Sequence, residues 1–211
     1  MSSKATQFKT ALLHPRYWLT WFGFALWRLV TLLPFPVLVV LGRGIGLLFY
    51  ALPSRRKTIA RRNIEICFPK LSSAEQKTML RANFISTGIA VMEVGIAWWW
   101  SKKRFSKLIH IEGRDNLEAV QGRGVMLLGI HFTTLEIGAA AVSTVIEMDG
   151  MYRAHGNPVY DFLQARGRLS KGFGNGVVYE RRDVRGTMKA LKNGRALWYG
   201  PDQDYGLQQG L

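Results

Sequence analysis

The chain has 211 residues, of which 48% are hydrophobic and 12% aromatic, enough for one compact domain with an accessory segment. This composition excludes a disordered or fibrous protein. The formal net charge of +15 at pH 7 indicates a surface that attracts nucleic acid, anionic lipid or an acidic protein. A single cysteine, Cys67, allows neither an internal disulfide nor a thiolate zinc site, so we expect most of the chain on a cytosolic face.

Two apolar runs lie near the N-terminus. The first, Tyr17 to Leu33, contains one charge, Arg28, and the second, Val37 to Leu52, contains Arg43. Both are at the short edge of the roughly 20 residues that usually span a bilayer. Tryptophans in the first run, basic residues before it and the lack of a cleavage site favour a retained N-terminal hydrophobic membrane-anchor helix over a signal peptide. A pair of buried core helices is the alternative.

A basic segment follows these runs. Five of the eight residues from Arg55 to Arg62 are Lys or Arg, which favours contact with anionic phospholipid and places this segment on the cytoplasmic side. A nucleic-acid interface is the rival interpretation, but aromatic side chains are not interleaved with these charges as stacking platforms. Residues 1–70 are therefore predicted to form a membrane anchor with a basic juxtamembrane segment, and we expect no nucleic-acid partner.

The rest of the chain, residues 71–211, has the pattern of a globular domain. Ser72 and Glu75 form a capping box that predicts a helix over residues 74–100. Further along, predicted strands and helices alternate, which favours an α/β fold with a mostly parallel sheet flanked by helices. The strands are predicted at 108–111, 125–130, 151–152, 177–179 and 196–199, and the helices at 116–121, 134–145, 158–169 and 184–192. Residues 124–130 are expected to form the central strand, buried on both faces.

His131 and Glu136 follow that strand. Ligands of such sheets bind beyond the carboxyl ends of the strands. With His131 on the strand-to-helix turn and Glu136 in the first turns of the next helix, the carboxylate can orient the imidazole, and the pair can act as a general base for a hydroxyl nucleophile. On spacing alone, a structural histidine near a helix start is the alternative.

The segment GIHFTTLE resembles the motif of a histidine and an acid five residues later in the lysophospholipid acyltransferase superfamily. Other segments narrow the resemblance to the late acyltransferases of lipid A biosynthesis, which transfer lauroyl, palmitoleoyl or myristoyl chains: HPRYWLTW, ARRNIEICFP, VMEVGIAWWW, MYRAHGNPVYDFLQARGRL and RRDVRGTMKALKNGRALWYGPDQDYG. They extend from about residue 10 to residue 206 in the family's order. The resemblance implies a glycerolipid acyltransferase-like fold.

The resemblance also implies a reaction. Family members transfer an acyl chain from acyl carrier protein to the hydroxyl of a 3-hydroxyacyl group on a Kdo-bearing lipid A precursor. His131 would deprotonate that hydroxyl and Glu136 would hold the ring, with no covalent acyl-enzyme; the sequence has no Gly-x-Ser-x-Gly nucleophile elbow. No cofactor is expected besides acyl carrier protein as co-substrate, and the four histidines show no metal-ligand spacing.

Further residues are expected to bind substrate. Arg153, at the end of a short strand, would lie beside the His131 turn, where a guanidinium can grip a phosphate; by resemblance this is the superfamily's phosphate-binding motif. A solvated helix end is the alternative for Arg166 and Arg168. The complete set of expected substrate-binding residues is Arg153, Asn157, Arg166, Arg168, Asp202 and Asp204.

The expected partners are acyl carrier protein, a lipid A precursor and anionic inner-membrane lipids, with the catalytic domain on the cytoplasmic face of the bacterial inner membrane. The family continues past residues 201–206 into further strands and helices, so the acyltransferase domain is expected to be incomplete at its C-terminus. Two other functions therefore stay open. One is an inactive, membrane-bound lipid-binding remnant, and the other is an acyltransferase that acts on glycerophospholipid.

Overall fold

The computed structural model describes residues 7–171 and 176–202. Contacts divide the chain into two compact units, one of residues 1–29 with 95–211 and one of residues 30–94. Residue 70, where the sequence predicts the boundary between anchor and acyltransferase domain, lies within the second of these units. The second apolar run, the basic segment and most of the following helix form a unit of their own, whereas the start of the first apolar run belongs to the sheet unit.

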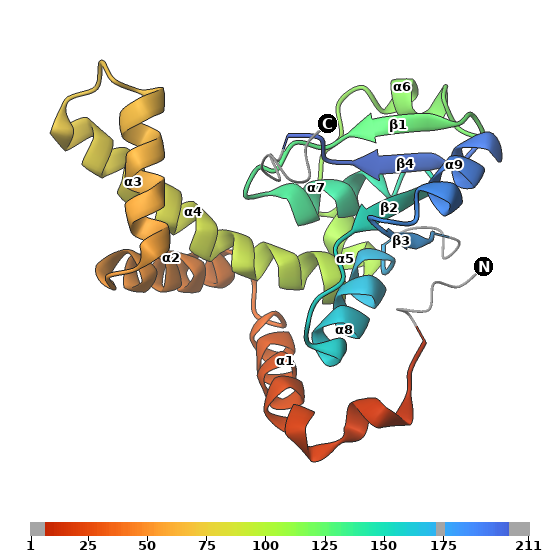
Figure 1. The fold of residues 1–211 in the computed structure, drawn as a ribbon, viewed down its shortest axis with the longest axis horizontal. Coiled ribbons are helices and arrows are strands. Elements are labelled where there is room, and N and C mark those ends of the chain that lie inside the picture. The colour runs from red at the N-terminus through yellow and green to blue at the C-terminus, as the bar shows by residue number, and fades with distance from the viewer. Residues whose placement is uncertain (1–6, 172–175, 203–211) are drawn as a thin grey trace. The chain divides into compact units, whose positions relative to one another are not determined.

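The sheet unit contains a four-stranded parallel sheet in the order β1-β4-β2-β3, and Figure 1 shows the strands side by side. This confirms the predicted α/β class with a parallel sheet. In the register, Val125 of β1 and Met148 of β2 both pair with Ala196 of β4. The strands are β1 (Val125–Leu128), β2 (Met148–Tyr152), β3 (Val178–Glu180) and β4 (Ala196–Tyr199).

Helices connect and flank these strands. Asn157 and Asp183 accept backbone N–H hydrogen bonds at the starts of α8 and α9, which explains where those helices begin. The helices of this unit are α1 (Trp18–Val30), α5 (Lys102–Ser106), α6 (Arg114–Glu118), α7 (Leu135–Val142), α8 (Pro158–Arg168) and α9 (Val184–Lys192). The helices predicted at 116–121, 134–145 and 158–169 are thus confirmed with shifted ends, and the helix predicted at 184–192 is confirmed with the same bounds, whereas α5 was not predicted.

Two strand predictions are wrong. β1 is an edge strand of the described sheet rather than its centre, and its side chains alternate: Met126 and Leu128 are 49% and 68% exposed. Residues 108–111 form no strand, because Leu108 N–H bonds to the Phe105 carbonyl in a turn after α5. Such a short apolar run has no periodicity that separates a strand from other buried segments.

One face of α1 is packed and the other is open. Phe24 lies against Trp98, Trp99 and Tyr160, so this side belongs to the core of the sheet unit. The other side exposes Trp18, Leu19, Phe22, Leu26 and Leu29. A helix of 13 residues is about 20 Å long, which is less than the roughly 30 Å of a bilayer core.

The helical unit contains α2 (Phe35–Ala51), α3 (Arg55–Cys67) and most of α4 (Ser73–Trp99). The Ser72 and Glu75 capping box at the start of α4 is confirmed, with the Ser72 N–H 2.8 Å from Glu75 Oε2. α2 and α4 cross closely at glycines. A Cβ on Gly42 would lie 2.7 Å from Ile89 Cα, and one on Gly88 would lie 2.2 Å from the Gly42 carbonyl oxygen. Only glycine permits this approach.

Length and composition single out one described helix, α4, as able to cross a membrane, and α2 with α3 passes the same test only as a pair bent by 91°. The N-terminal run predicted as the anchor is not the helix that meets this test. The physical reason is that residues 31–34 separate the two apolar helices. α1 has 13 residues and α2 has 17, so each alone is shorter than the 18 residues that the test requires.

Candidate functional site

The site lies at the carboxyl edge of the sheet, where β1 and β4 end. β1 leads through Gly129 and Ile130 to His131, and α7 then begins at Leu135. Gly129 N–H bonds to the Tyr199 carbonyl at 2.8 Å, which continues the pairing of the two strands as far as the loops. The loop after β4, Gly200 to Asp202, is thereby held beside His131.

His131 is held by Asp202. Its Nδ1 lies 2.7 Å from Asp202 Oδ1, and its backbone N–H donates to Asp202 Oδ2 at 2.8 Å. These bonds hold the pKa of the Asp202 carboxyl below its ordinary value, so the carboxylate is ionised at neutral pH. A carboxylate on Nδ1 fixes the proton there and leaves Nε2 as the basic nitrogen.

Gly200 makes room for this pair. A Cβ at that position would lie 2.6 Å from His131 Cε1, closer than unbonded carbons approach. The small residue is thus required by the ring that sits against it, not by an unusual backbone angle.

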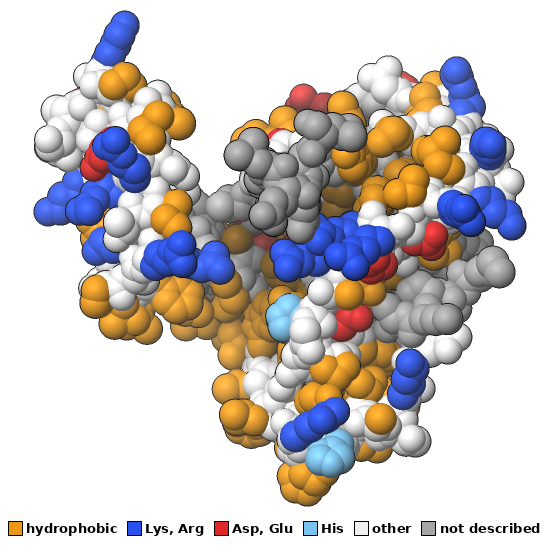
Figure 2. Space-filling view, viewed as in Figure 1, with side chains coloured by type: hydrophobic (Ala, Val, Ile, Leu, Met, Phe, Trp, Pro, Cys, Tyr) orange, Lys and Arg blue, Asp and Glu red, His pale blue; other side chains and the backbone are white. Residues whose placement is uncertain are grey.

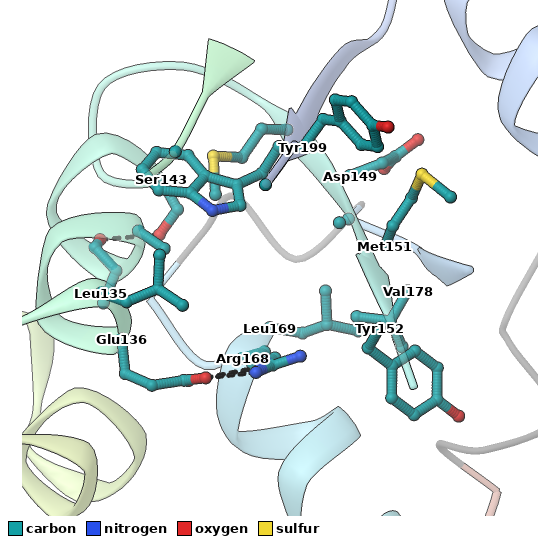
Figure 3. Close-up of a pocket in the computed structure, with 18 of the residues that line it drawn as sticks. Leu135, Glu136, Ser143, Asp149, Met151, Tyr152, Arg168, Leu169, Val178 and Tyr199 are labelled. Carbon is teal, nitrogen blue, oxygen red and sulfur yellow. Dashed lines mark hydrogen bonds and ion pairs between the residues drawn. The ribbon is translucent and has the colours of Figure 1, made fainter. Parts of the chain in front are cut away.

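Glu136 has different partners from those expected. Its Oε2 accepts from the Trp98 indole N–H at 3.1 Å, and its Oε1 accepts from Arg168 Nε at 2.9 Å and from a second guanidinium nitrogen. Figure 3 shows Glu136 from α7 and Arg168 from α8 pointing toward each other across the pocket. Within the described residues, no hydrogen bond joins Glu136 to His131, because the carboxylate is occupied by these three donors.

A cavity of about 540 Å³ connects these groups. Its polar lining includes His131, Glu136, Arg153 and Arg168. Its apolar lining comes from α7, α8 and the sheet: Leu135, Ala139, Ala140, Met148, Met151, Leu169, Val178 and Trp198. Such a size and mixture are typical of small-ligand sites, which range from about 300 to 1,000 Å³.

Near the amino end of β2, the buried carboxylate of Asp149 lines the same cavity. Asp149, 1% exposed, accepts from Arg195 at 2.6 Å and from the Val177 N–H at 2.8 Å. The Asp149 carboxylate raises the pKa of Arg195, so this pair is charged. The cavity therefore extends along β2 from Arg153, just past the carboxyl end, to the Asp149 carboxylate near the amino end, about 13 Å by the rise of four residues.

Arg153 follows β2 and lines the cavity together with His131, although β4 lies between their two strands. Its side chain is exposed and has no carboxylate partner among the described residues. The loop that carries it is anchored by Asp161, which accepts from the His155 N–H and from the Tyr152 hydroxyl. Burial, and next Asp161, raise the pKa of Tyr152 to about 12, so it remains a donor.

The other predicted substrate-binding residues differ in whether they line the cavity. Arg168 lines the cavity, whereas Asn157 and Arg166 do not. The Asn157 side chain caps α8 and donates to Thr20 at 3.0 Å, so its amide already has structural partners. Arg166 is exposed, with its guanidinium over the Phe162 ring. Asp204 lies outside the described residues.

Sequence reasoning missed two features of the site. One is the Trp98 bond to Glu136; Trp98 begins a run of three adjacent tryptophans, and this is the signal in the sequence that could have indicated the position. The other is that Asp202 contacts His131. Both residues follow parallel strands, so the carboxyl-edge rule could have brought them together. Within residues 7–171 and 176–202, no group of three His, Cys, Asp or Glu side chains could hold a metal ion.

Comparison with known proteins identifies the family. Residues 5–211 match the family described as bacterial lipid A biosynthesis acyltransferase. The chain belongs to this family. It is 45% identical to the lipid A biosynthesis lauroyltransferase of Escherichia coli over 202 residues, which are 95% of this chain and 65% of that protein.

Other members are also similar. The Escherichia coli lipid A biosynthesis palmitoleoyltransferase is 44% identical over 95% of this chain and 65% of its own length. A lipid A biosynthesis acyltransferase of Haemophilus influenzae is 42% identical over 97% of this chain and 66% of its own length. The chain thus spans slightly less than two thirds of each of these relatives.

Proposed function

We propose that this protein transfers a fatty acyl chain from acyl carrier protein to the hydroxyl of a 3-hydroxyacyl chain on a Kdo-lipid A precursor. The observation that carries the proposal is that His131, held by Asp202, lines a largely apolar cavity that a hydrocarbon chain can fill. Family membership supports the class of reaction.

In the proposed reaction, His131 Nε2 accepts the proton of the acceptor hydroxyl as its oxygen attacks the thioester carbonyl carbon. The carbon–sulfur bond then breaks, and the imidazolium returns the proton to the leaving thiolate of the carrier. Asp202 holds the ring in the tautomer with a basic Nε2 and stabilises the imidazolium while it is charged. No covalent acyl-enzyme forms, and no other co-reactant is needed.

The rest of the cavity has separate roles. The apolar side chains of α7, β2 and β3 surround the acyl chain, and the Asp149 carboxylate, which pairs with Arg195, contributes a charge to the same lining. Arg153 grips a phosphate of the acceptor, because a guanidinium without a protein carboxylate can bind phosphate through two hydrogen bonds. Glu136 fixes Arg168 and Trp98, and so sets the shape of the cavity between α7 and α8.

The proposal places the protein at the cytoplasmic face of the bacterial inner membrane. The open face of α1 and the apolar helix α4 support contact with lipid. The net charge of +15 supports attraction of acidic carrier protein, of phosphorylated lipid A precursors and of anionic lipids.

The test is an assay of the purified chain with acyl carrier proteins that bear chains of different length. A phosphorylated tetra-acylated lipid A precursor and a lysophospholipid are offered as acceptors, and the products are identified by mass spectrometry. We expect the lipid A precursor to gain one acyl chain. Consumption of the lysophospholipid alone would instead identify a glycerophospholipid acyltransferase, and a bound but unaltered precursor would identify a lipid-binding protein.

A further inference from the structure

The helical unit has a cavity of its own, formed entirely by residues outside the catalytic site. It has a volume of about 500 Å³ and is lined by the end of α2, by α3 and by the first turns of α4. Its cationic side chains are Lys57 and Arg61 from α3 and Lys77 from α4. Lys77 lies outside the basic segment that the sequence singled out, so the cavity combines charges from two helices.

Two of the three cations have contacts that limit where they can point. The Lys57 ammonium donates to the Tyr50 carbonyl and lies 4.2 Å from the centre of the Tyr50 ring. Arg61 lies 3.9 Å from Glu65, whose carboxylate also pairs with Arg62 at 3.1 Å. Lys77 has no carboxylate partner among the described residues. The three cations outnumber the single carboxylate that lines the cavity.

Neutral polar groups complete the lining. Ser54, Thr58, Ser73 and Gln76 bring hydroxyl and amide groups to the same cavity. Ser54 also caps α3 by accepting the Lys57 backbone N–H at 3.2 Å, so the positive end of a 13-residue helix lies at this cavity. Ammonium and guanidinium groups beside hydroxyls are a typical setting for a phosphate group.

Exposed apolar side chains, called here the apolar rim, come from the same end of α2 and from the same helix α3 that supply the lining. Leu48, Phe49 and Leu52, from the turn of α2 that carries Tyr50, are 57%, 44% and 51% exposed, and Ile59 on α3 is 49% exposed. Figure 2 shows Lys and Arg side chains gathered over the α3 and α4 region and hydrophobic side chains over α2. A water-soluble anion would gain nothing from this apolar rim, whereas a lipid has both a phosphate and hydrocarbon.

We propose that this cavity binds the headgroup phosphate of an anionic phospholipid, whose acyl chains lie along Leu48, Phe49 and Leu52. This assigns a discrete lipid site, formed by Arg61 and Lys77 together, rather than a diffuse attraction of the whole basic segment to the membrane. An acidic protein surface is the competing partner. It would use the exposed charges of α3 but not the cavity or the apolar rim.

The experiment measures binding of the full chain to phosphatidylcholine vesicles with and without phosphatidylglycerol. Arg61→Gln and Lys77→Gln remove a cation from the cavity, and Arg56→Gln, on α3 but outside the lining, is the matched control. All three side chains are exposed, so the variants should fold; unchanged thermal unfolding checks this. The control should weaken phosphatidylglycerol-dependent binding by at most about fivefold, the contribution of one surface cation. Each cavity variant should weaken it by more than about tenfold, because a charge-assisted hydrogen bond is lost as well.

A fourth variant, Thr58→Trp, fills the cavity without changing the charge and should also weaken binding to phosphatidylglycerol vesicles. Equal losses for Arg56→Gln, Arg61→Gln and Lys77→Gln would show diffuse attraction and overturn the proposal, as would unaltered binding by Thr58→Trp. Loss of binding to acyl carrier protein, with vesicle binding unchanged, would assign the surface to a protein partner instead. None of these readouts depends on acyl transfer, so they stand apart from the proposed catalytic function.

Discussion

The two acidic side chains of the candidate site, Asp202 and Glu136, occupy contrasting surroundings. Asp202 follows β4 in an exposed loop and makes its side-chain contacts with His131. Glu136 lies in the first turn of α7 and is 17% exposed, with Arg168 and Trp98 as donors. The carboxylate that is close in sequence to the histidine is thus committed elsewhere, and the one that orients the ring lies 71 residues away. Sequence spacing marks the right region of the fold but does not identify the contact.

The strongest test of this contrast is the activity of His131 variants. In an active preparation, His131→Ala should lower the acyl-transfer rate by about 10²- to 10⁴-fold, the usual contribution of a positioned base. Asp202→Asn should lower the acyl-transfer rate by a large part of the same factor. The rate of the double variant should be only slightly lower than that of His131→Ala alone, because both residues serve one proton transfer. The measurement is kcat/KM for the four proteins.

His110→Ala is the control for these rates. His110 is exposed and lies outside the cavity lining, so its loss should leave kcat/KM near the parent value. A folded His131→Ala protein with near-parent turnover would refute the mechanism, whereas an additive loss in the double variant would separate Asp202 from the proton transfer.

A second test concerns the half-buried pair of Glu136 and Arg168. Glu136→Gln removes the charge that Arg168 contacts, and we expect the free energy of unfolding to fall by about 1–3 kcal/mol, as for other hydrogen bonds to charged groups that are withdrawn from solvent. Arg168→Met should show coupling with Glu136→Gln in a double-mutant cycle, measured by denaturant unfolding. His131→Ala should not, because His131 and Glu136 share no partner among the described contacts. Strong coupling between His131 and Glu136 would restore the arrangement predicted from their spacing.

These pairs show what the sequence could and could not reveal. The positions of His131 and Glu136 after a strand were predicted correctly, because the apolar run and the helix pattern are local. The start of β2 was missed, since Asp149 and Gly150 interrupt its apolar pattern; Asp149 is buried only because Arg195 neutralises it. β1 was placed at the centre of the sheet because strand order depends on pairing between distant segments, which local patterns do not encode.

A third test compares two arginines of the cavity. Arg168 is held by Glu136, whereas Arg153 is exposed and has no carboxylate partner among the described residues. Arg153→Ala should therefore raise the acceptor KM by about tenfold or more with little effect on kcat, since it removes a phosphate contact made in both ground and transition states. With a monophosphorylated acceptor, the KM values of the variant and the parent should differ less. A fall in kcat with an unchanged KM would assign Arg153 to the transition state, for example as a stabiliser of the thioester oxyanion.

The last test concerns a buried charge, the Lys171 ammonium, which unlike Glu136 has no oppositely charged partner among the described residues. Lys171 is 1% exposed, and its ammonium donates to the Ser170 hydroxyl and lies 5.4 Å from the centre of the Phe105 ring, with no carboxylate partner among the described residues. Burial, and next the charge of Lys102, lower the pKa of Lys171 to about 8 from an ordinary value of 10.5. Between these two pH values the unfolded chain binds more protons than the folded one, so stability should rise with pH across that window.

Lys171→Met should remove this rise and increase the melting temperature at pH 7, where the parent carries a buried cation. Thermal unfolding of both proteins from pH 7 to 10 measures the difference, and parallel curves would show that Lys171 is paired or hydrated in solution.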